Sequence, residues 1–500
     1  MWTAYFDETN VKQCELFEAL ACAIPTLSQD EKASVVNRLI EDLEKHEEYE
    51  WNDKVTLRAL EALKLLGRER ESAGPLFTER GMRVLCRHAG VLSKRAVDTL
   101  CSCEALKCIA NCIHLCADVK QYLEKNNILE GCFDLLKLPQ LSVDGQFLAC
   151  RILFFVTVGR EDLVEKLISL DIGQCITKIC TGHVKTLQSG RSKLSSTSPI
   201  HPMSVLSEAL KLLFSLMLVD SRRETKETDD KESSAGDTFE PCLGPIFDIL
   251  FTLPCPEPLP LAPPLSHAVH CLMQFSFEAV ESYWKEHQKN GSPALVVETL
   301  VDVLSRSVIY LIPNNEPDEV KDSSTVDATL SPLLLVLRTL AKGDLRLRQS
   351  LSVLLLPQES DRIQPVHQGT RLPAYLIRLM TCALLPQTRD AVSELLWILC
   401  DEQASEFTQQ VGYGNAIGFL VNKGIPMAAP TDSNGPRDQN TNPITGQRLE
   451  DEDQGPSLAD MTDEEKEREA ERLFVLFERL KKTGLVDVEN PIAKAMRENY

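Results

Sequence analysis

The four residues Glu-Ala-Leu-Lys occur three times in this chain of 500 residues, each time inside an apolar helical stretch. The copies lie at 61–64, 104–107 and 208–211, and a similar stretch at 147–158 carries Arg151 at the basic position. The first two intervals between the basic positions are nearly equal, and the third is longer because it contains a polar run at 188–202. A period of about 40–47 residues is typical of armadillo and HEAT repeats. Such solenoids usually provide binding surfaces, because each repeat packs only on its neighbours.

The repeat pattern continues toward the C-terminus with longer intervals. His270, Arg338 and Trp397 occupy the next equivalent places, and polar or Pro-rich insertions account for the added length. We find no alternating strand pattern, so the fold class is predicted as all-α. We expect an armadillo/HEAT-like, right-handed superhelical solenoid over residues 1–423, followed by a C-terminal tail with an amphipathic helix. The expected loops of the solenoid lie near 188–202, 221–240, 313–329 and 357–370.

The bulk properties exclude several classes of protein. A net charge of −21 and a pI near 5.0 argue against nucleic-acid binding, which needs clustered Lys and Arg. No apolar run approaches the length of a membrane-spanning helix, and the first residues lack the cationic start of a signal peptide. We therefore expect a cytoplasmic protein without a membrane span.

The 17 cysteines include a dense cluster at Cys101, Cys103, Cys108, Cys112 and Cys116, with His114 among them. A zinc site is one interpretation of this cluster. However, Cys108, Cys112 and Cys116 follow a helical i, i+4, i+8 spacing, and no paired zinc-knuckle spacing is present. Because free Cys packs as a small hydrophobic residue, we predict core packing and no metal site.

The sequence lacks the short motifs of common enzymes. It has no phosphate-binding loop of the Gly-x4-Gly-Lys-Ser/Thr type, no His-Glu-x-x-His and no Gly-x-Ser-x-Gly. A cysteine-dependent enzyme stays an alternative, because a Cys and a His can meet in space only. We expect a protein that is not an enzyme and needs no cofactor.

The repeated basic residues predict a binding groove. If the Glu-Ala-Leu-Lys helices line the concave face, they form a basic ladder along one groove. Its members are Lys64, Lys107, Arg151, Lys211, His270 and Arg338. Such a ladder would favour a peptide with acidic side chains or a free carboxylate, with Asn111 bonding its backbone and Phe214 and Trp397 as apolar anchors. The alternative is that these cations only solvate the exposed edges of amphipathic helices.

The C-terminal segment has two parts. Residues 424–461 are poor in apolar side chains, and we expect a flexible acidic linker there. Thr462 and Glu465 form a capping-box pattern that opens a helix, and the predicted C-terminal region is 462–500. Phe474 and Phe477 lie on one apolar face of that helix. This face would either pack back on the solenoid or dock on a partner.

Four motifs carry a resemblance to a known family. They are IRLM at 377–380, GYGNA at 412–416, NPITG at 442–446 and MTDEEKEREAERLFVLFERL at 461–480. Together with the N-terminal helices, they resemble the synembryn family, whose members are cytosolic exchange factors and folding chaperones for the α subunits of heterotrimeric G proteins. The end of the tail resembles the fungal branch. The resemblance spans nearly the whole chain.

The resemblance implies a function without covalent chemistry. In the family, an armadillo/HEAT superhelix takes the C-terminal helix of Gα into its concave face, and the tail reaches the nucleotide-binding domain near the switch region. GDP then leaves Gα, because the exchange factor binds the open state of Gα preferentially. This preference raises the population of the open state and lowers the affinity for GDP. We expect a monomer that forms a 1:1 complex, recruitment to the cell cortex through the G protein, and the following contacts with Gα: Lys64, Arg68, Lys107, Asn111, Arg151, Lys211, Phe214, Arg338, Arg378, Phe474 and Phe477.

Two alternatives remain open at the level of sequence. One is a plain armadillo scaffold or adaptor that binds linear peptides without exchange activity. The other concerns regulation: animal members of the family carry phosphorylation sites in acidic context before NPxTG, whereas here the acidic run 449–453 follows that element. Ser457 and Thr462 fit an acidophilic kinase, and a phosphate near Thr462 would favour a helix N-terminus.

Overall fold

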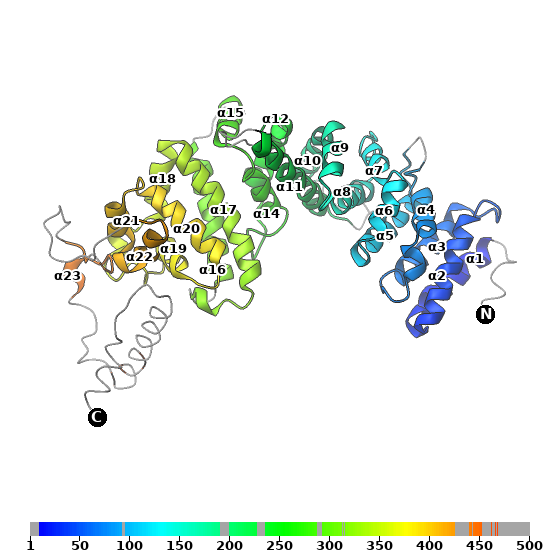
Figure 1. Cartoon of the computed structure of the whole chain (residues 1–500), viewed down its shortest axis with the longest axis horizontal. Coiled ribbons are helices and arrows are strands. Elements are labelled where there is room, and N and C mark those ends of the chain that lie inside the picture. The colour runs from blue at the N-terminus through cyan, green and yellow to red at the C-terminus, as the bar shows by residue number, and fades with distance from the viewer. Residues whose placement is uncertain are drawn as a thin grey trace. The chain divides into compact units, whose positions relative to one another are not determined.

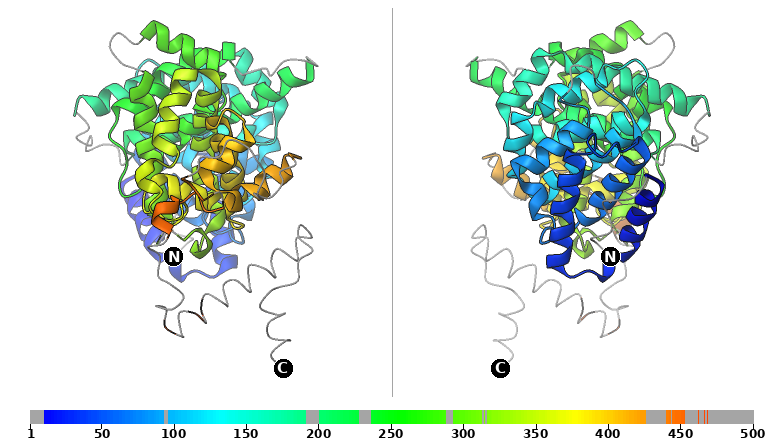
Figure 2. Two further views of the ribbon diagram at one scale, coloured as in Figure 1. Left: turned by 90° about the vertical axis from the view of Figure 1, so that its left-hand side faces the viewer. Right: turned by 90° about the vertical axis from the view of Figure 1, so that its right-hand side faces the viewer.

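The described part of the chain is helical throughout, apart from loops and one isolated bridge between Thr441 and Arg448. The structure is a computed structural model, and it describes residues 10–92, 96–190, 200–227, 236–287, 293–312, 314, 316–425, 440–442, 444–452, 462, 466 and 468. All labelled elements in Figure 1 are helices, and the side views of Figure 2 contain no sheet among the coloured residues. The predicted all-α class is confirmed. The specific armadillo/HEAT superhelix stays a prediction.

Two compact units divide the chain. The first contains residues 1–356 and 378–402, and the second contains residues 357–377 and 403–500. These units do not coincide with the predicted division of the chain at residue 423, where the solenoid is expected to end. That domain boundary stays a prediction. Two of the expected loops contain helix: α11 continues through Glu227, and α17 begins at Ser323.

One row of helices in the first unit contains the repeated motif. Its members pack in succession, each on the next, and they follow one another from the blue to the yellow end of the first unit in Figure 1. They are α1 (Asn10–Ala23), α3 (Asp53–Leu66), α5 (Leu100–Leu115), α8 (Val143–Thr157), α11 (Pro202–Glu227), α14 (Leu265–Leu272), α17 (Ser323–Gly343) and α20 (Pro386–Leu399). We call this series the motif row. Successive packing of this kind is what a helical solenoid requires.

Other helices of the first unit form a second succession. They are α2 (Gln29–Glu44), α4 (Glu79–His88), α6 (Val119–Lys125), α7 (Ile128–Leu136), α9 (Glu161–Ser169), α10 (Ile172–Gln188), α13 (Leu243–Thr252) and α15 (Phe277–His287). Each contacts the next in this order. The unit also contains α12 (Gly236–Phe239), α16 (Pro293–Leu311), α18 (Leu345–Leu355) and the short 3-10 turns Ile24–Thr26, Gly74–Phe77, Glu240–Cys242 and Pro317–Glu319.

Local sequence explains where the motif helices begin and which face they bury. The Asn52 side chain accepts the Val55 amide hydrogen at the start of α3, and Ser142 caps α8 in the same way through the Gly145 amide. Along α3, Val55, Ala59, Leu60, Ala62, Leu63 and Leu66 are buried at the spacing of one helix face. Lys64 falls at the edge of that face and is half-buried.

The cysteine cluster packs into the interior in part: Cys103, Cys108 and Cys112 are buried, whereas Cys101 and Cys116 are half-buried. Cys108 and Cys112 are 2% and 0% exposed in α5, and burial raises the pKa of the Cys108 thiol to about 12. No group of three or more potential metal ligands occurs among the residues that the structure describes. Because the thiolate is the reactive form, these buried thiols are poorly suited to nucleophilic catalysis.

Helix α11 is long and apolar enough to cross a membrane, although the sequence predicts no such stretch. Residues 202–222 form the one such candidate in the part described, with a mean hydropathy of 1.6 over the best window, half of which is buried. The helix packs against α8, α10 and α14, and it contains the ion pair between Glu208 and Lys211. The apolar character of α11 is explained by its place in the core of the motif row, where neighbouring helices cover it.

The second unit is built around two short helices and an irregular segment. Helices α21 (Ala404–Val411) and α22 (Tyr413–Asn422) pack together, α19 (Leu372–Thr381) begins in this unit and ends in the first, and α23 (Leu449–Glu452) is a single turn. A 3-10 turn, Glu359–Asp361, precedes Arg362. The expected linker over 424–461 thus includes residues 440–442 and 444–452, which have defined contacts in this unit.

A buried carboxylate in α2 makes the stability of the first unit depend on pH. Asp42 is 0% exposed, and neither of its side-chain oxygens has a hydrogen bond within the described residues. Burial raises the pKa of Asp42 to about 7, although Arg38 Nε lies 3.4 Å from Oδ1 and opposes the shift. The folded state therefore favours the protonated carboxyl group up to near-neutral pH.

We predict that Asp42→Asn removes a loss of stability that occurs as pH rises. Because the folded pKa lies above the unfolded one, the contribution of protonated Asp42 is complete near pH 4 and is lost as pH passes through about 7. The variant should gain about 2–4 kcal/mol relative to wild type between pH 4 and pH 8. Urea unfolding at both pH values measures this difference, and parallel curves for the two proteins would contradict it.

Candidate functional site

The motif row brings the first four members of the expected ladder onto successive helices. Lys64, Lys107, Arg151 and Lys211 belong to α3, α5, α8 and α11, each of which packs on the next. All four side chains are partly exposed, at 23%, 26%, 40% and 35%. The four cations thus lie along one succession of helices, and their role as a ligand-binding ladder stays a prediction.

A buried glutamate joins the first two cations. Lys64 Nζ lies 2.5 Å from Glu104 Oε2, and Lys107 Nζ lies 2.7 Å from Glu104 Oε1. Burial tends to raise the pKa of Glu104, but the hydrogen bonds from Lys107 and Lys64 hold it below the usual value. Lys107 also lies 3.7 Å from Asp144 at the start of α8. The charges of α3, α5 and α8 thus form one connected network.

The second pair of cations repeats this arrangement. Glu208 Oε1 lies 2.8 Å from Lys211 Nζ and 3.6 Å from Arg151 Nη1, and its side chain is only 6% exposed. The carboxylate therefore links α8 to α11 as Glu104 links α3 to α5. Each bridging glutamate is the first residue, and each lysine the last, of its own Glu-Ala-Leu-Lys motif.

Aromatic side chains surround the second pair. The Arg151 guanidinium lies 5.5 Å and 5.4 Å from the ring centres of Phe147 and Phe155, within the range of cation–π attraction. Phe214 packs edge-on against His270, with 5.4 Å between ring centres. This surface of α8, α11 and α14 combines cations with apolar rings, which suits a ligand that has both an acidic group and apolar side chains.

The remaining candidate residues are distributed more widely. Arg68 is exposed, whereas Asn111, Arg338 and Arg378 are half-buried. Trp397 is 5% exposed and packs in the core of α20, so it is not the surface anchor that the sequence suggested. Ser457, Phe474 and Phe477 lie outside the residues described, and the Thr462 carbonyl accepts the Lys466 amide hydrogen at 3.0 Å.

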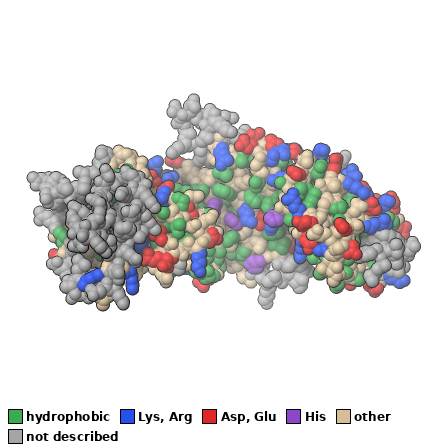
Figure 3. All heavy atoms as spheres, turned by 60° about the horizontal axis from the view of Figure 1, so that its bottom comes forward, with side chains coloured by type: hydrophobic (Ala, Val, Ile, Leu, Met, Phe, Trp, Pro, Cys, Tyr) green, Lys and Arg blue, Asp and Glu red, His purple; other side chains and the backbone are tan. Residues whose placement is uncertain are grey.

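Sequence reasoning missed the bridging glutamates, although their signal was present. In the motifs at 104–107 and 208–211, the first residue supplies the carboxylate that pairs with the lysine three positions later, one turn along the same helix face. In the motif at 61–64, Glu61 pairs with Arg58 instead. The ladder is consequently an alternation of cations and carboxylates. Figure 3 shows basic, acidic and hydrophobic side chains interleaved over one face of the molecule, with no segregated basic surface among the described residues that it draws.

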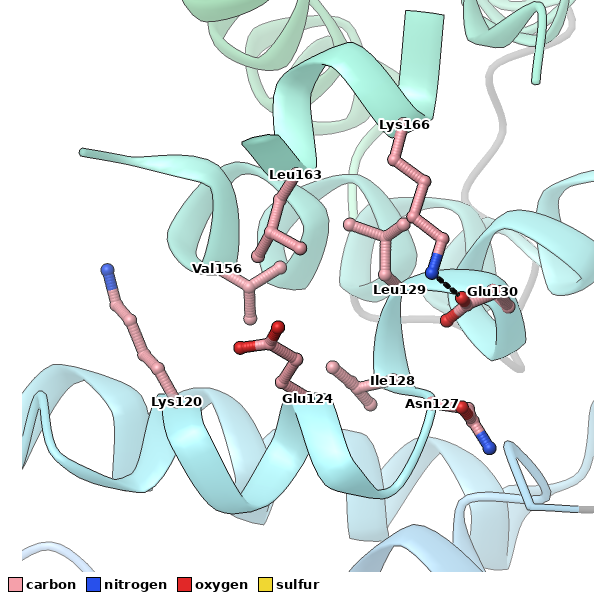
Figure 4. Close-up of a pocket in the computed structure, with 9 residues that line it drawn as sticks. All are labelled: Lys120, Glu124, Asn127, Ile128, Leu129, Glu130, Val156, Leu163 and Lys166. Carbon is pink, nitrogen blue, oxygen red and sulfur yellow. Dashed lines mark ion pairs between the residues drawn. The ribbon is translucent and has the colours of Figure 1, made fainter. Parts of the chain in front are cut away.

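Two cavities in the first unit lie outside the cationic ladder. A cavity of about 60 Å³ between α6, α7, α8 and α9 is lined by Lys120, Glu124 and an ion pair between Lys166 and Glu130 (Figure 4). It has room for one or a few water molecules. A larger cavity of about 510 Å³ lies between α10 and residues 136–141, where His183 Nε2 and Gln146 Oε1 are 2.8 Å apart. No residue of the expected peptide contacts lines either cavity.

The second unit brings two of the sequence motifs together. The Gly414 amide of GYGNA donates to the Ile444 carbonyl of NPITG at 3.2 Å. The segment 362–366 completes this contact, because the Val366 amide donates to the Thr445 carbonyl at 3.1 Å. The motifs thus form one structural element although they are well separated along the chain, at 412–416 and 442–446.

These features define a class of protein: a helical-repeat protein whose motif row exposes paired cations and aromatic rings. Comparison with known proteins identifies the family. The sequence profile described as guanine nucleotide exchange factor synembryn matches residues 59–499, so the chain belongs to the synembryn family. The resemblance seen in the sequence motifs is thereby confirmed.

Individual relatives can be aligned with this chain over most of their length. The chain is 24% identical to chaperone Ric-8A of Gallus gallus, with 92% of this chain and 86% of the relative covered. It is 25% identical to chaperone Ric-8A of Danio rerio, with 86% and 81% covered. It is also 26% identical to a synembryn-like chaperone of Schizosaccharomyces pombe, with 91% and 86% covered.

We predict that Glu104→Gln destabilises the first unit, because it leaves two partly buried ammonium groups without their shared carboxylate. The expected loss is about 2 kcal/mol at pH 7. Since the pKa of Glu104 is lowered from its ordinary value of 4.5 in the folded state, this loss should be complete above that value and should diminish as pH falls through the lower folded pKa. Denaturant unfolding at pH 7 and pH 3.5 measures the effect.

A matched control is Glu281→Gln in α15, where Glu281 pairs at 2.9 Å with Lys285, whose side chain is 70% exposed. Removing that pair should change stability by less than about 0.5 kcal/mol. Equal effects of the two substitutions would show that the buried bridge has no special contribution.

Proposed function

We propose that this protein is a guanine nucleotide exchange factor and folding chaperone for G-protein α subunits. Membership in a family described as exchange factors supports the general role, as do relatives described as chaperones. The observation that carries the proposal is the surface of α8, α11 and α14, where Arg151, Lys211 and Phe214 place cations beside aromatic rings. The C-terminal helix of Gα ends in a carboxylate and has an apolar face, which matches this chemistry.

In this proposal, the motif row binds the Gα C-terminal helix in a concave groove. Lys64, Lys107, Arg151 and Lys211 contact acidic groups, with Arg68, Asn111, Arg338 and Arg378 as further contacts. The partly exposed cations keep donors available, because Glu104 and Glu208 occupy only part of each hydrogen-bonding shell. The bridging carboxylates also set a threshold: a peptide must offer apolar contacts as well as charge to compete with them.

Binding that favours the nucleotide-free state of Gα would release GDP without any covalent step. A ligand shifts an equilibrium only by its difference in affinity between two states. A protein that holds the displaced C-terminal helix therefore lowers GDP affinity, and by the same linkage it stabilises newly made Gα before nucleotide enters. We propose that the tail, including Phe474 and Phe477, contacts the switch region, that the complex is 1:1, and that it forms in the cytoplasm, with recruitment to the cortex through Gα.

We predict that the full chain accelerates GDP release from purified Gα and that truncation after residue 423 reduces this acceleration. The truncated protein should still bind a peptide of the Gα C-terminus, because the motif row is intact. Release of labelled GDP and peptide binding by fluorescence anisotropy measure the two activities. Peptide binding without any acceleration by the full chain would favour a peptide-binding scaffold or a pure chaperone.

We predict that Phe214→Ala weakens binding of the Gα C-terminal peptide at least about ten-fold, because a buried aromatic anchor contributes roughly 2 kcal/mol or more to an interface. Phe251→Ala in α13 is the matched control. Phe251 is also half-buried and forms an aromatic pair with 5.4 Å between ring centres, but it lies outside the motif row. Equal losses of affinity for the two variants would place the peptide elsewhere.

A further inference from the structure

A buried arginine organises the second unit. Arg362 is 6% exposed, and its Nη1 donates to the Gly446 carbonyl at 3.0 Å and to the Gln409 carbonyl at 3.2 Å. Nη2 donates to Gln410 Oε1 at 2.7 Å. All three of these acceptors are uncharged. The guanidinium thus ties the end of the NPITG turn to the end of α21, where GYGNA begins.

The turn itself is preorganised by Asn442. The Asn442 side-chain oxygen accepts the amide hydrogens of Ile444 and Thr445 at 2.8 Å and 3.3 Å, which is an Asx turn. The Gly446 amide donates to the Asn442 carbonyl at 2.9 Å, and the Asn442 amide donates to the Gln447 carbonyl at 2.7 Å. The chain therefore closes on itself between Thr441 and Arg448, where the isolated bridge occurs.

Two glycines permit the close approach of this turn to the rest of the unit. Gly412 has φ +83°, and a Cβ there would lie 2.6 Å from the Ile444 carbonyl oxygen. Gly446 has φ +71°, and a Cβ there would lie 2.9 Å from Val366. Both positions combine a left-handed backbone with contact too close for a side chain.

The other side of the turn is held by backbone contacts to the segment 362–366. The Arg448 amide donates to the Arg362 carbonyl at 2.8 Å, and Gln447 Nε2 donates to the Ile363 carbonyl at 3.0 Å. Gln447 is 9% exposed. The turn is thus bound on both sides by segments that precede it far back in the chain.

We propose that Arg362 is a positioning residue that anchors the NPITG turn and thereby fixes the point from which the C-terminal tail acts on its partner. This inference rests on the proposed exchange function. With the turn anchored, the tail begins after α23, which directly follows the turn. The segment 426–439 then adds nothing to the distance that the tail can span. The anchor sets the effective concentration of the tail at the bound partner.

The expected size of the effect follows from chain length. The relevant linker ends at Thr462, where the predicted tail helix opens. It runs from Glu452 with the anchor and from Ile425 without it, so loss of the anchor makes the linker roughly four times as long. Effective concentration falls roughly as the −3/2 power of linker length, so loss of the anchor should lower the contribution of the tail about seven-fold.

The test uses full-length Arg362→Gln, which removes the donors to Gly446 and Gln409. The amides of Gly414, Val366 and Arg448 should exchange faster with deuterium, and tail-dependent GDP release from Gα should fall about seven-fold. Binding of the Gα C-terminal peptide should stay unchanged. Asn442→Ala disrupts the Asx turn while Arg362 is intact, and it should give the same result. This variant replaces Arg362→Gln as the test if Arg362→Gln folds poorly.

Two controls separate anchoring from a general effect. Arg371→Gln removes an exposed guanidinium that pairs with Asp361 at 3.1 Å in the same unit, and it should alter neither readout. Insertion of a short Gly/Ser segment between Ile425 and Asn440 should leave GDP release unchanged, because the anchor isolates the tail from this part of the chain. The proposal is overturned if the amides lose protection without slower release, or if the insertion slows release as much as Arg362→Gln.

Failure of the proposed function has a different signature. If the wild-type chain does not accelerate GDP release, the exchange proposal and the positioning role both fail. Loss of amide protection in Arg362→Gln would still establish the structural anchor in that case. If exchange is present and the three amides are unprotected in wild type, the anchor itself is refuted while the exchange function stands.

Discussion

Carboxylates buried between neighbouring helices connect the cations of the motif row. Glu104 contacts both Lys64 and Lys107, and Glu208 contacts both Arg151 and Lys211. The two charged partners of each glutamate offset the cost of its burial, so losing either partner weakens the compensation. These contacts join α3 to α5 and α8 to α11, and they hold the exposed cations at defined positions along the row. The proposed peptide surface thus depends on the same interactions that fix the packing of the repeats.

Much of the architecture was predictable because helical periodicity and repeat spacing are local signals. The interval between Lys64 and Lys107 predicted that α3 and α5 would be neighbours, and their shared contact with Glu104 agrees. Cys108, Cys112 and Cys116 are expected in the core from their spacing on one helix face. The first two are buried, whereas Cys116 follows the last residue of α5 and is half-buried. In each case the pattern of a single helix determined which side chains face inward.

The parts that sequence reasoning missed depend on contacts between distant segments. Sequence reasoning predicts the cations of the ladder but not the carboxylates that pair with them. A glutamate three positions before a lysine is common on any exposed helix face and so gives no specific signal. Trp397 was assigned to the surface, whereas the packing of α20 buries it. The union of GYGNA, NPITG and Arg362 requires three segments that no periodic pattern connects. Such long-range contacts are fixed by tertiary structure, and a polar, Pro-containing stretch gives no local sign of them.

The burial of so many thiols has a practical consequence for a protein of this class. Thirteen of the 17 cysteines are buried in the helical interior, and Cys22 is exposed. A thiol that is shielded from water reacts slowly with alkylating reagents, whereas the same thiol in an unfolded chain is accessible. The buried thiols are therefore internal reporters of folding, distributed along the motif row and its neighbours. Mass labelling of the cysteines could follow, helix by helix, which part of the motif row opens first under stress.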